Sequence, residues 1–449
     1  MQSSETKLTR EQKQAVGLLS IGTFLEYFDL MLYIHMAVLL NELFFPKYDP
    51  HTAALLSAFT FCSTYLLRPL GALFFGYIGD HVGRKHTVVI TTLLMSISCV
   101  IMANLPTYAQ IGITAAWLVT ICRMIQGMSS MGEIIGAQIY LTETIKRPLQ
   151  YPVVAVLSVL AALGGTAALG IASLVTSHSF NWRLAFWIGA GVAFIGSIAR
   201  TALRETPEFV DAKRRLKRNF EQVNIDSKVL ESNPVYKEKV NKMTALAFLL
   251  IQCGWPICFY IAFIHCSNIL QNSFGYDAEQ VIHQNFIVSV VEILGVLLSM
   301  VYLSYYIHPI LILKIKLAVF SVFILLYPFL LNIVSTPFQL LLIQSFIMFF
   351  VLEDTPAKPI FFDHFPVFKR FTSSAFLYAL SRAFMFVVTS FGLVYLTKYF
   401  SNWGLLFIAI PVVVGYTWGL FYFQRLEEET GNYPQKGKSL VSSNERELA

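Results

Sequence analysis

The chain has 449 residues, of which 56% are hydrophobic and only 13% are charged, whereas an ordinary soluble domain carries about 25% charged residues. This composition excludes a single water-soluble domain and favours a protein that crosses a membrane several times. The formal net charge of +6 does not indicate a nucleic-acid partner, because basic residues of membrane proteins gather in their cytoplasmic loops.

Apolar stretches long enough to span a bilayer, about 20 residues each, recur along the whole chain. We expect an all-α membrane protein with twelve membrane-spanning helices. They are predicted at about 15–40, 52–78, 86–104, 109–141, 151–176, 183–203, 243–270, 281–304, 309–331, 336–361, 372–398 and 402–424. No cleavable signal peptide is expected, since the first residues are polar and the first apolar stretch is too long for a signal core.

Basic residues alternate between the predicted loops. They precede the first helix and recur in loops 2–3, 4–5, 6–7, 8–9 and 10–11, while the other loops are poor in them. Because positive loops stay in the cytoplasm, both termini are expected there. A charged stretch at 204–242 divides a six-helix half at 1–203 from a second half at 243–424, and 425–449 is predicted to be a disordered cytoplasmic tail.

Two groups of six helices joined by a charged loop resemble the plan of the major facilitator superfamily. The string GYIGDHVGRK, which begins at Gly76, resembles the superfamily's motif in loop 2–3, with His81 where that motif has Arg. The resemblance implies that the loop is a cytoplasmic gate and that its aspartate holds the halves closed on that side. The gating residues implied by the motif are Gly76, Asp80, Gly83 and Arg84.

Seven further strings resemble one branch, the metabolite:proton symporters, which includes proline/betaine, citrate, 2-oxoglutarate and shikimate transporters. They are EYFD, FFPKYDP, RPLGALFFG, LPTYAQIGI, RMIQGMSSMGEIIGA, NWRLAFWIG and LRETPEF, and they cover nearly all of 20–210. The second half resembles the family only in layout, because LSYYIHPILILKI lacks the key residues of the equivalent loop. The resemblance implies a transporter, not an enzyme, in a bacterial inner membrane; we expect a monomer without cofactors.

The first predicted helix contains two carboxylates in an apolar setting. Gly22, Glu26, Asp29 and Tyr33 are spaced by four, three and four residues, so a helix places them along one stripe. Ionisable groups inside a membrane are costly unless they have partners or face water. We therefore expect both carboxylates to face a cavity between the halves.

The fourth predicted helix carries a matching stripe of Arg123, Gln126, Ser130 and Glu133. A guanidinium keeps its charge and needs an anion, which could be Asp29 or a carboxylate of the solute. If the solute displaces Asp29 from Arg123, Asp29 can take a proton, which would couple the two fluxes. The alternative is a static ion pair. The resemblance points to the same coupling roles for Asp29, Arg123 and Glu133. On the stripe of the first helix, Glu26 is expected to be a helper of Asp29 or an anion that lines the cavity.

Other polar residues inside predicted helices have more than one interpretation. Arg68 is expected either to contact the solute or to snorkel or pair with a neighbouring carboxylate. Pro356 and Pro359 are expected to break the tenth helix. Two candidate ion pairs are Glu353 or Asp354 with Lys358, and Glu292 with Arg382. Candidate cavity residues along the seventh helix are Gln252, Trp255 and Tyr260. The small residues of ALGGTAALG are expected to permit close helix contact.

We therefore predict proton-coupled uptake of a small carboxylate-bearing or zwitterionic solute by alternating access. The alternatives are an exchanger or antiporter, and a sensor of the same fold that binds solute without moving it. Cys253 and Cys258 show no metal-ligand spacing and are interpreted as packed thiols. No metal site is predicted.

Overall fold

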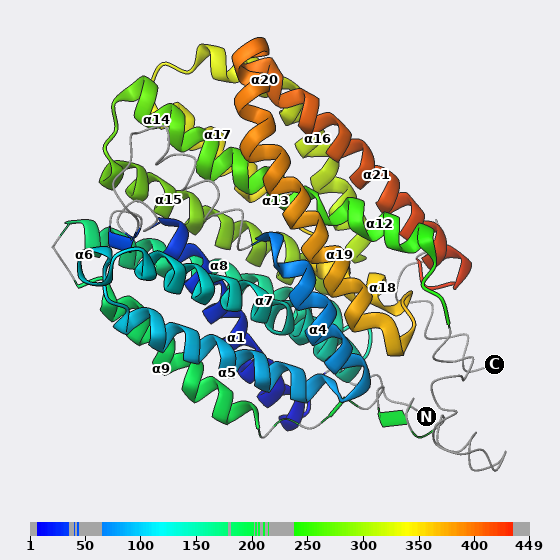
Figure 1. Ribbon diagram of the computed structural model, residues 1–449. Coiled ribbons are helices and arrows are strands. Elements are labelled where there is room, and N and C mark those ends of the chain that lie inside the picture. The colour runs from blue at the N-terminus through cyan, green and yellow to red at the C-terminus, as the bar shows by residue number, and fades with distance from the viewer. Residues whose placement is uncertain are drawn as a thin grey trace.

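The computed structural model describes residues 7–35, 40, 43–44, 65–177, 181–201, 203, 205–206, 210–211, 214 and 238–433. Within these residues the chain is helical, and its helices form two groups that lie side by side (Figure 1). The first group runs from blue to teal in the figure and the second from green to red.

The N-terminal half consists of regular α-helices. They are α1 (Arg10–His35), α4 (Arg68–His81), α5 (Arg84–Asn104), the short α6 (Tyr108–Ile111), α7 (Ile113–Thr144), α8 (Gln150–Ser177) and α9 (Arg183–Arg200). Helix α1 packs against α8, and α5 packs against α7 and α9. At Gly164 of α8, an added Cβ would overlap the Phe24 carbonyl of α1, which confirms that small residues permit this close contact.

The helices of the C-terminal half are interrupted by π-helical and 3₁₀ turns. The elements are α12 (Lys242–Gln252), α13 (Gly254–Phe259), η2 (Tyr260–His265), α14 (Cys266–Phe274), α15 (Ala278–Val296), η3 (Leu297–Tyr302), η4 (Leu303–Tyr305), α16 (Pro309–Ile333), α17 (Pro337–Phe349), η5 (Thr355–Ala357), α18 (Lys358–Asp363), α19 (Val367–Val387), η6 (Val388–Gly392), α20 (Leu393–Phe400), η7 (Ser401–Leu405) and α21 (Leu406–Glu429). Three of them, η2, η3 and η6, are π-helical. Such turns are rare and occur often at functional sites.

The tenth predicted helix is broken, as its prolines led us to expect. Helix α17 ends at Phe349, residues 351–354 are not helical, and the chain resumes in η5 and α18. Pro356 and Pro359 each lie in the first turn of the element that follows the break, where a missing N–H is tolerated. The break places Glu353 and Asp354 on non-helical backbone in the middle of the protein.

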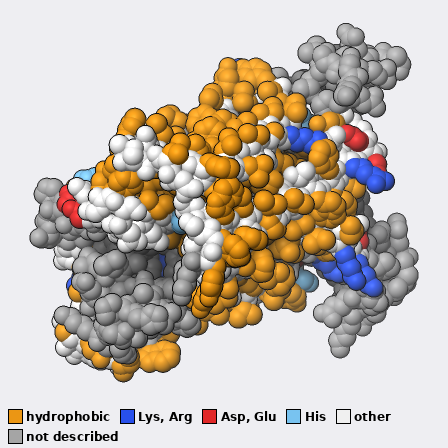
Figure 2. Space-filling model, turned by 90° about the horizontal axis from the view of Figure 1, so that it is seen from above, with side chains coloured by type: hydrophobic (Ala, Val, Ile, Leu, Met, Phe, Trp, Pro, Cys, Tyr) orange, Lys and Arg blue, Asp and Glu red, His pale blue; other side chains and the backbone are white. Residues whose placement is uncertain are grey.

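Seven of the described segments are long and apolar enough to cross a bilayer: Arg84–Asn104, Gln150–Leu174, Lys242–Phe274, Glu279–Tyr305, Pro309–Ile333, Val367–Thr397 and Ser401–Glu429. Hydrophobic side chains cover most of the face in Figure 2, and Lys and Arg gather at one end of it. The count of twelve spans stays a prediction, in part because residues 45–64 of the first loop and second helix lie outside the described residues.

The beginning of α1 and the end of α21 lie at the same end of the molecule. Gln12 donates a hydrogen bond from Nε2 to the Thr144 carbonyl at the end of α7, over 3.1 Å. Arg147, just beyond α7, pairs with Glu427 near the end of α21. The assignment of this end to the cytoplasm follows from the loop charges and stays a prediction. Helix α21 ends at Glu429, five residues beyond the predicted boundary, and residues 434–449 of the predicted tail lie outside the described residues.

Candidate functional site

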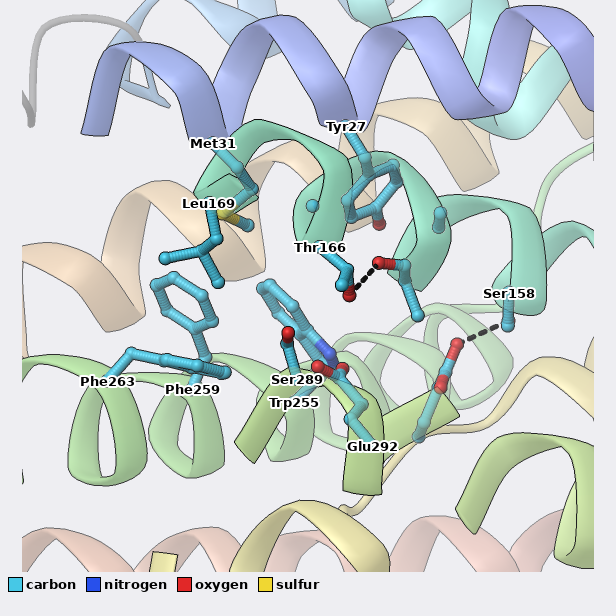
Figure 3. A pocket seen from close by; sticks show the side chains of 14 residues that line it. Tyr27, Met31, Ser158, Thr166, Leu169, Trp255, Phe259, Phe263, Ser289 and Glu292 are labelled. Carbon is cyan, nitrogen blue, oxygen red and sulfur yellow. Dashed lines mark hydrogen bonds between the residues drawn. The ribbon is translucent and has the colours of Figure 1, made fainter. Parts of the chain in front are cut away.

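A central cavity with two lobes lies between the halves. The first, here called the aromatic lobe, has a volume of about 490 Å³, and its wall includes Trp255, Phe259, Phe263 and Glu292 (Figure 3). The second, here called the charged lobe, has a volume of about 350 Å³. Its wall includes Gln138 from the N-terminal half and, from the C-terminal half, Asp354, Lys358, Tyr378 and Arg382. Five residues line both lobes, which are therefore adjacent: Tyr27, Ser158, Ala161, Trp255 and Glu353.

A chain of polar contacts organises the charged lobe. Arg382 donates from Nη1 to Oε1 and to the backbone oxygen of Gln252, at 3.0 Å each. Gln252 in turn donates from Nε2 to Asp354 at 2.5 Å, and Asp354 lies 3.7 Å from Nζ of Lys358. The Arg382 guanidinium also lies 3.5 Å from the centre of the Tyr378 ring. The predicted pair of Asp354 with Lys358 is thus confirmed, and it forms part of the cavity wall.

The two glutamates of the cavity have different surroundings. Glu353 accepts hydrogen bonds through Oε1 from the hydroxyls of Ser158 and Thr355, at 2.5 and 2.6 Å. Glu292 rises from α15 into the aromatic lobe beside Trp255 (Figure 3). The suggested pair of Glu292 with Arg382 is wrong for the described residues, because the Arg382 guanidinium is engaged by Gln252 and Tyr378 instead.

On α1, Asp29 belongs to a buried cluster inside the N-terminal half. Its carboxylate lies 3.1 Å from Nη1 of Arg123, and it accepts a hydrogen bond from Nε2 of Gln126, also at 3.1 Å. Arg123 donates to Oε1 of Gln126 at 2.9 Å, and the Cys99 thiol of α5 donates to Asp29 at 3.6 Å. All four side chains are buried. The sequence stripe therefore identified a real ion pair between α1 and α7.

The expected orientation of that stripe needs correction. The residues of α1 that line the cavity lobes are Thr23, Tyr27 and Met31, and neither Glu26 nor Asp29 is among them. At about 100° per residue, the carboxylates lie roughly a third of a turn away from the cavity face. Arg123 is likewise outside the lining of both lobes. Glu26 and Asp29 of α1 face α4, α5 and α7, because those helices supply Arg68, Cys99, Arg123 and Gln126 as their partners.

Glu26 pairs with Arg68 of α4, whose Nη2 lies 3.3 Å from Oε1 of Glu26. Both side chains are buried, and the Arg68 guanidinium lies 4.6 Å from the centre of the Tyr65 ring. Of the two interpretations of Arg68, the structure thus shows the ion pair. The side chains of Tyr33 and Glu133 lie outside the described residues.

The α4–α5 turn forms a contact between the halves. Asp80 accepts hydrogen bonds from the backbone N–H groups of Phe371 and Thr372 of α19, at 3.1 and 2.8 Å. It also accepts from the Thr372 hydroxyl at 2.7 Å and lies 3.0 Å from Nη1 of Arg84. An added Cβ at Gly76 would lie 2.6 Å from the Thr372 Cα. Glycine is therefore required for α4 to approach α19 this closely.

Arg84 extends this contact into a buried network, here called the gate network. It lies 3.1 Å from Glu143 of α7 and donates from Nη2 to the Val367 carbonyl at the start of α19, over 2.7 Å. Glu143 also binds Arg370 of α19 at 3.1 Å. Neither Glu143 nor Arg370 was predicted as a site residue; Glu143 lies two residues after the fourth predicted helix, and Arg370 lies beside Lys369, two residues before the eleventh.

Gly83 has a φ of 147° at the N-terminus of α5, a region that favours glycine. Because it has no side chain to cap the helix, the carboxylate of Glu205 does so and accepts from the Arg84 backbone N–H at 2.9 Å. All four residues of the predicted gate motif thus have a structural task at the junction of the halves.

A second ionic contact joins the halves at the same end. Arg147 lies 2.7 Å from Glu427 of α21 and 2.7 Å from Asp363 of α18. Beside it, the His308 ring packs between Tyr151 and Tyr433, and burial lowers the pKa of His308 to about 4. The C-terminal half, which lacks the gate motif, is thus held to the N-terminal half by a different set of charges.

Comparison with known proteins supports the family. The model of the Major Facilitator Superfamily matches residues 19–370. The chain belongs to the major facilitator superfamily. Its members are membrane transporters and not enzymes. Similar relatives include the proline/betaine transporter of Salmonella typhimurium, 31% identical over 60% of this chain and 54% of that protein. The inner membrane metabolite transport protein YhjE of Escherichia coli is 37% identical over 48% of this chain and 54% of its own length.

The match covers about half the length of these relatives. Among solved structures, the proton:xylose symporter XylE bound to 6-bromo-6-deoxy-D-glucose superposes with a TM-score of 0.71 and 14% identity, over 96% of this chain and 97% of XylE. The human organic anion transporter MFSD10 gives a TM-score of 0.65, also at 14% identity, over 93% of this chain and all of that chain. At this identity the likeness shows the fold alone, and it extends over both halves.

Proposed function

We propose that this chain is a secondary active transporter that takes up a small carboxylate-bearing or zwitterionic organic solute together with protons. The supporting observation is a polar cavity between the halves that is lined by both of them and separated from one end of the molecule by the gate network. In alternating access the halves rock about such a site. We further propose twelve spans with both termini in the cytoplasm, and a monomer in the bacterial inner membrane.

Arg382 and Lys358 are the proposed ligands of the solute carboxylate. Both line the charged lobe, and guanidinium and ammonium groups are suited to bind carboxylates. Arg123, whose expected anion was Asp29 or a carboxylate of the solute, is held by Asp29 and Gln126 and lines neither lobe. The relatives support the solute class, since two of them are named a proline/betaine transporter and a glycine betaine/proline/ectoine/pipecolic acid transporter.

Asp29 is the proposed proton carrier. It is a buried carboxylate that, among the described residues, has Arg123 as its one cationic partner. A conformational change that separates the two therefore leaves a carboxylate that favours its protonated form. Its helix also carries Tyr27 and Met31 in the cavity wall. A movement of α1 in response to solute would therefore change the distance between Asp29 and Arg123.

Reconstitution into liposomes tests this function. With an inward proton gradient, labelled proline or glycine betaine is expected to accumulate above its external concentration, and a protonophore is expected to abolish the accumulation. Counterflow without accumulation would favour the exchanger. Binding without any movement of label would favour the sensor.

A further inference from the structure

The aromatic lobe has a continuous wall of rings. Trp255 and Phe259 stack with centroids 5.0 Å apart at 19°, and Phe263 continues the row at 5.2 Å. These residues follow one another at intervals of four along the seventh helix, and Figure 3 shows their side chains on the same side of the lobe. Tyr27 and Met31 of α1 close the opposite side.

Glu292 places a carboxyl group on the wall of this lobe. Within the described part of the chain its carboxylate makes no ion pair. Two cations of the C-terminal half have other hydrogen-bond partners: Arg382 donates to Gln252, and the buried Lys316 donates to the Ser299 hydroxyl at 3.3 Å. Lys316 lines neither lobe, although its charge acts on Glu292 from behind the cavity wall. The Glu292 carboxyl group therefore faces the cavity, while Lys316 does not.

The two lobes differ in charge. The cations of the cavity wall, Lys358 and Arg382, line the charged lobe and not the aromatic one. Among the described residues, the wall of both lobes has three carboxyl groups (Glu292, Glu353 and Asp354) and these two cations. The cavity therefore has a ring-lined part with carboxyl groups and a part that offers cations.

We propose that the aromatic lobe is a subsite for a positively charged alkylated nitrogen, and that Glu292 selects zwitterionic solutes over di- and tricarboxylates. This inference rests on the proposed function, which assigns the solute carboxylate to Arg382 and Lys358. Alkylammonium groups are attracted to the faces of aromatic rings, and a carboxylate nearby adds to that attraction. A second carboxylate of the solute would instead meet the carboxyl group of Glu292 in a lobe that neither Lys358 nor Arg382 lines.

Three probes separate these contributions in equilibrium binding to the purified full chain. Glycine betaine carries the cation and the carboxylate. Its isostere 3,3-dimethylbutanoate has carbon in place of nitrogen and differs in that charge alone, and succinate carries a second carboxylate. The wild-type protein is expected to bind glycine betaine at least fivefold more tightly than either of the other probes.

Two variants then test the assignment, with Glu279→Gln in the first turn of α15 as the matched control. Glu292→Gln is expected to lower the preference for glycine betaine over 3,3-dimethylbutanoate at least threefold, and Glu279→Gln is expected to leave it unchanged. Trp255→Leu keeps Glu292 and removes a ring from the wall, and it is also expected to lower the preference for glycine betaine. This second variant tests the subsite if Glu292→Gln does not fold.

The outcomes distinguish this inference from the proposed function. If 3,3-dimethylbutanoate or succinate binds and the preference for glycine betaine is below fivefold, the subsite is overturned while carboxylate transport stands. A preference that neither Glu292→Gln nor Trp255→Leu changes also overturns it. If none of the three probes binds, both proposals fail.

Discussion

The two halves of the protein use their charged side chains in different ways. In the N-terminal half, Asp29 pairs with Arg123 and Glu26 with Arg68, all of them buried between continuous α-helices. In the C-terminal half, Glu292, Lys358 and Arg382 line the cavity, and the helices around them contain three π-helical turns and a break. No π-helical turn occurs in the described part of the N-terminal half.

This difference separates two tasks that a transporter must combine. Removing one partner of a buried ion pair costs roughly 3–5 kcal/mol. Protonation of a buried carboxylate therefore has a large energetic effect, which suits the N-terminal half to couple protonation to a conformational change. Charged groups on irregular backbone are suited to meet a solute. We infer that coupling belongs mainly to the first half and recognition mainly to the second, and the following experiments test this division.

The largest effect is expected from Asp29→Asn, which mimics a permanently protonated carboxylate. Accumulation driven by a pH gradient should be abolished, because no proton can be gained or lost at this position. Counterflow should survive, since it needs no net proton movement and the cavity wall is unchanged. Uptake and counterflow assays on the same liposomes measure both. Undiminished accumulation with an unchanged pH dependence would make the Asp29–Arg123 pair a structural contact only.

The next effect concerns the two arginines. Arg382→Lys should weaken solute binding about 10- to 100-fold, because a hydrogen bond to a charged group is worth roughly 1.5–3 kcal/mol and lysine lacks the guanidinium fork. Arg123→Lys, the matched change in the N-terminal half, should alter the dissociation constant less than about threefold. Isothermal titration measures both variants. The reverse ranking would return the carboxylate site to Arg123 and break the division between the halves.

A smaller effect is expected from Asp80→Asn at the junction of the halves. The variant loses the charge that accepts from two backbone N–H groups and from Arg84, so the closed gate should be less favoured by roughly 1–3 kcal/mol. Transport should slow severalfold while solute affinity is retained. A cysteine at the cavity residue Ser158 should react faster with a maleimide added from the gate side.

Asp277→Asn serves as the control for this experiment. Asp277 caps α15 and lies outside the gate network. The same labelling rate in Asp80→Asn as in Asp277→Asn, together with normal transport, would show that the turn is not a gate.

The smallest effect is expected at His308, beside the second contact between the halves. Its pKa is lowered to about 4 by burial, so the folded state holds it neutral between Tyr151 and Tyr433. Stability from this group is present above pH 6.5 and is lost as the pH falls from 6.5 to about 4, because the unfolded chain takes up the proton first. Thermal unfolding of His308→Leu should therefore lose less stability over this range than the wild type. An equal loss of stability in the wild type and in His308→Leu would exclude a contribution from His308. Both proteins contain the neighbouring charges Glu427 and Arg147, so these charges cannot cause a difference between them.

The sequence was sufficient for the family, for an all-helical fold and for the contacts that follow from helical spacing, while the count of twelve spans stays a prediction. Asp29, Arg123 and Gln126 were found because depth and periodicity bring them together, and the break in the tenth helix followed from Pro356 and Pro359. The rotation of α1 was not predictable, since a stripe of carboxylates indicates a shared face but not which neighbour that face meets. Tyr27, which lines both lobes, is not part of that stripe.

Contacts between the halves were the hardest to predict. Arg370 lies far from Glu143 in sequence, and no spacing rule connects the two. The same holds for Arg147 with Glu427. The suggested pair of Glu292 with Arg382 failed because the choice of partner depends on Gln252 and Tyr378, which approach Arg382 only in the folded protein.

The contact of Asp80 with α19 has an evolutionary consequence. Asp80 binds the backbone N–H groups of Phe371 and Thr372, and every amino acid except proline supplies such a group. Most substitutions at these two positions therefore leave those two bonds available. These two bonds thus depend on one side chain of the first half and only on the backbone of the second, whereas the contacts of Arg370 with Glu143 and of the Thr372 hydroxyl with Asp80 need side chains from both halves. We infer that the C-terminal half can acquire new side chains around its cavity, and so new solutes, without loss of the two backbone bonds to Asp80.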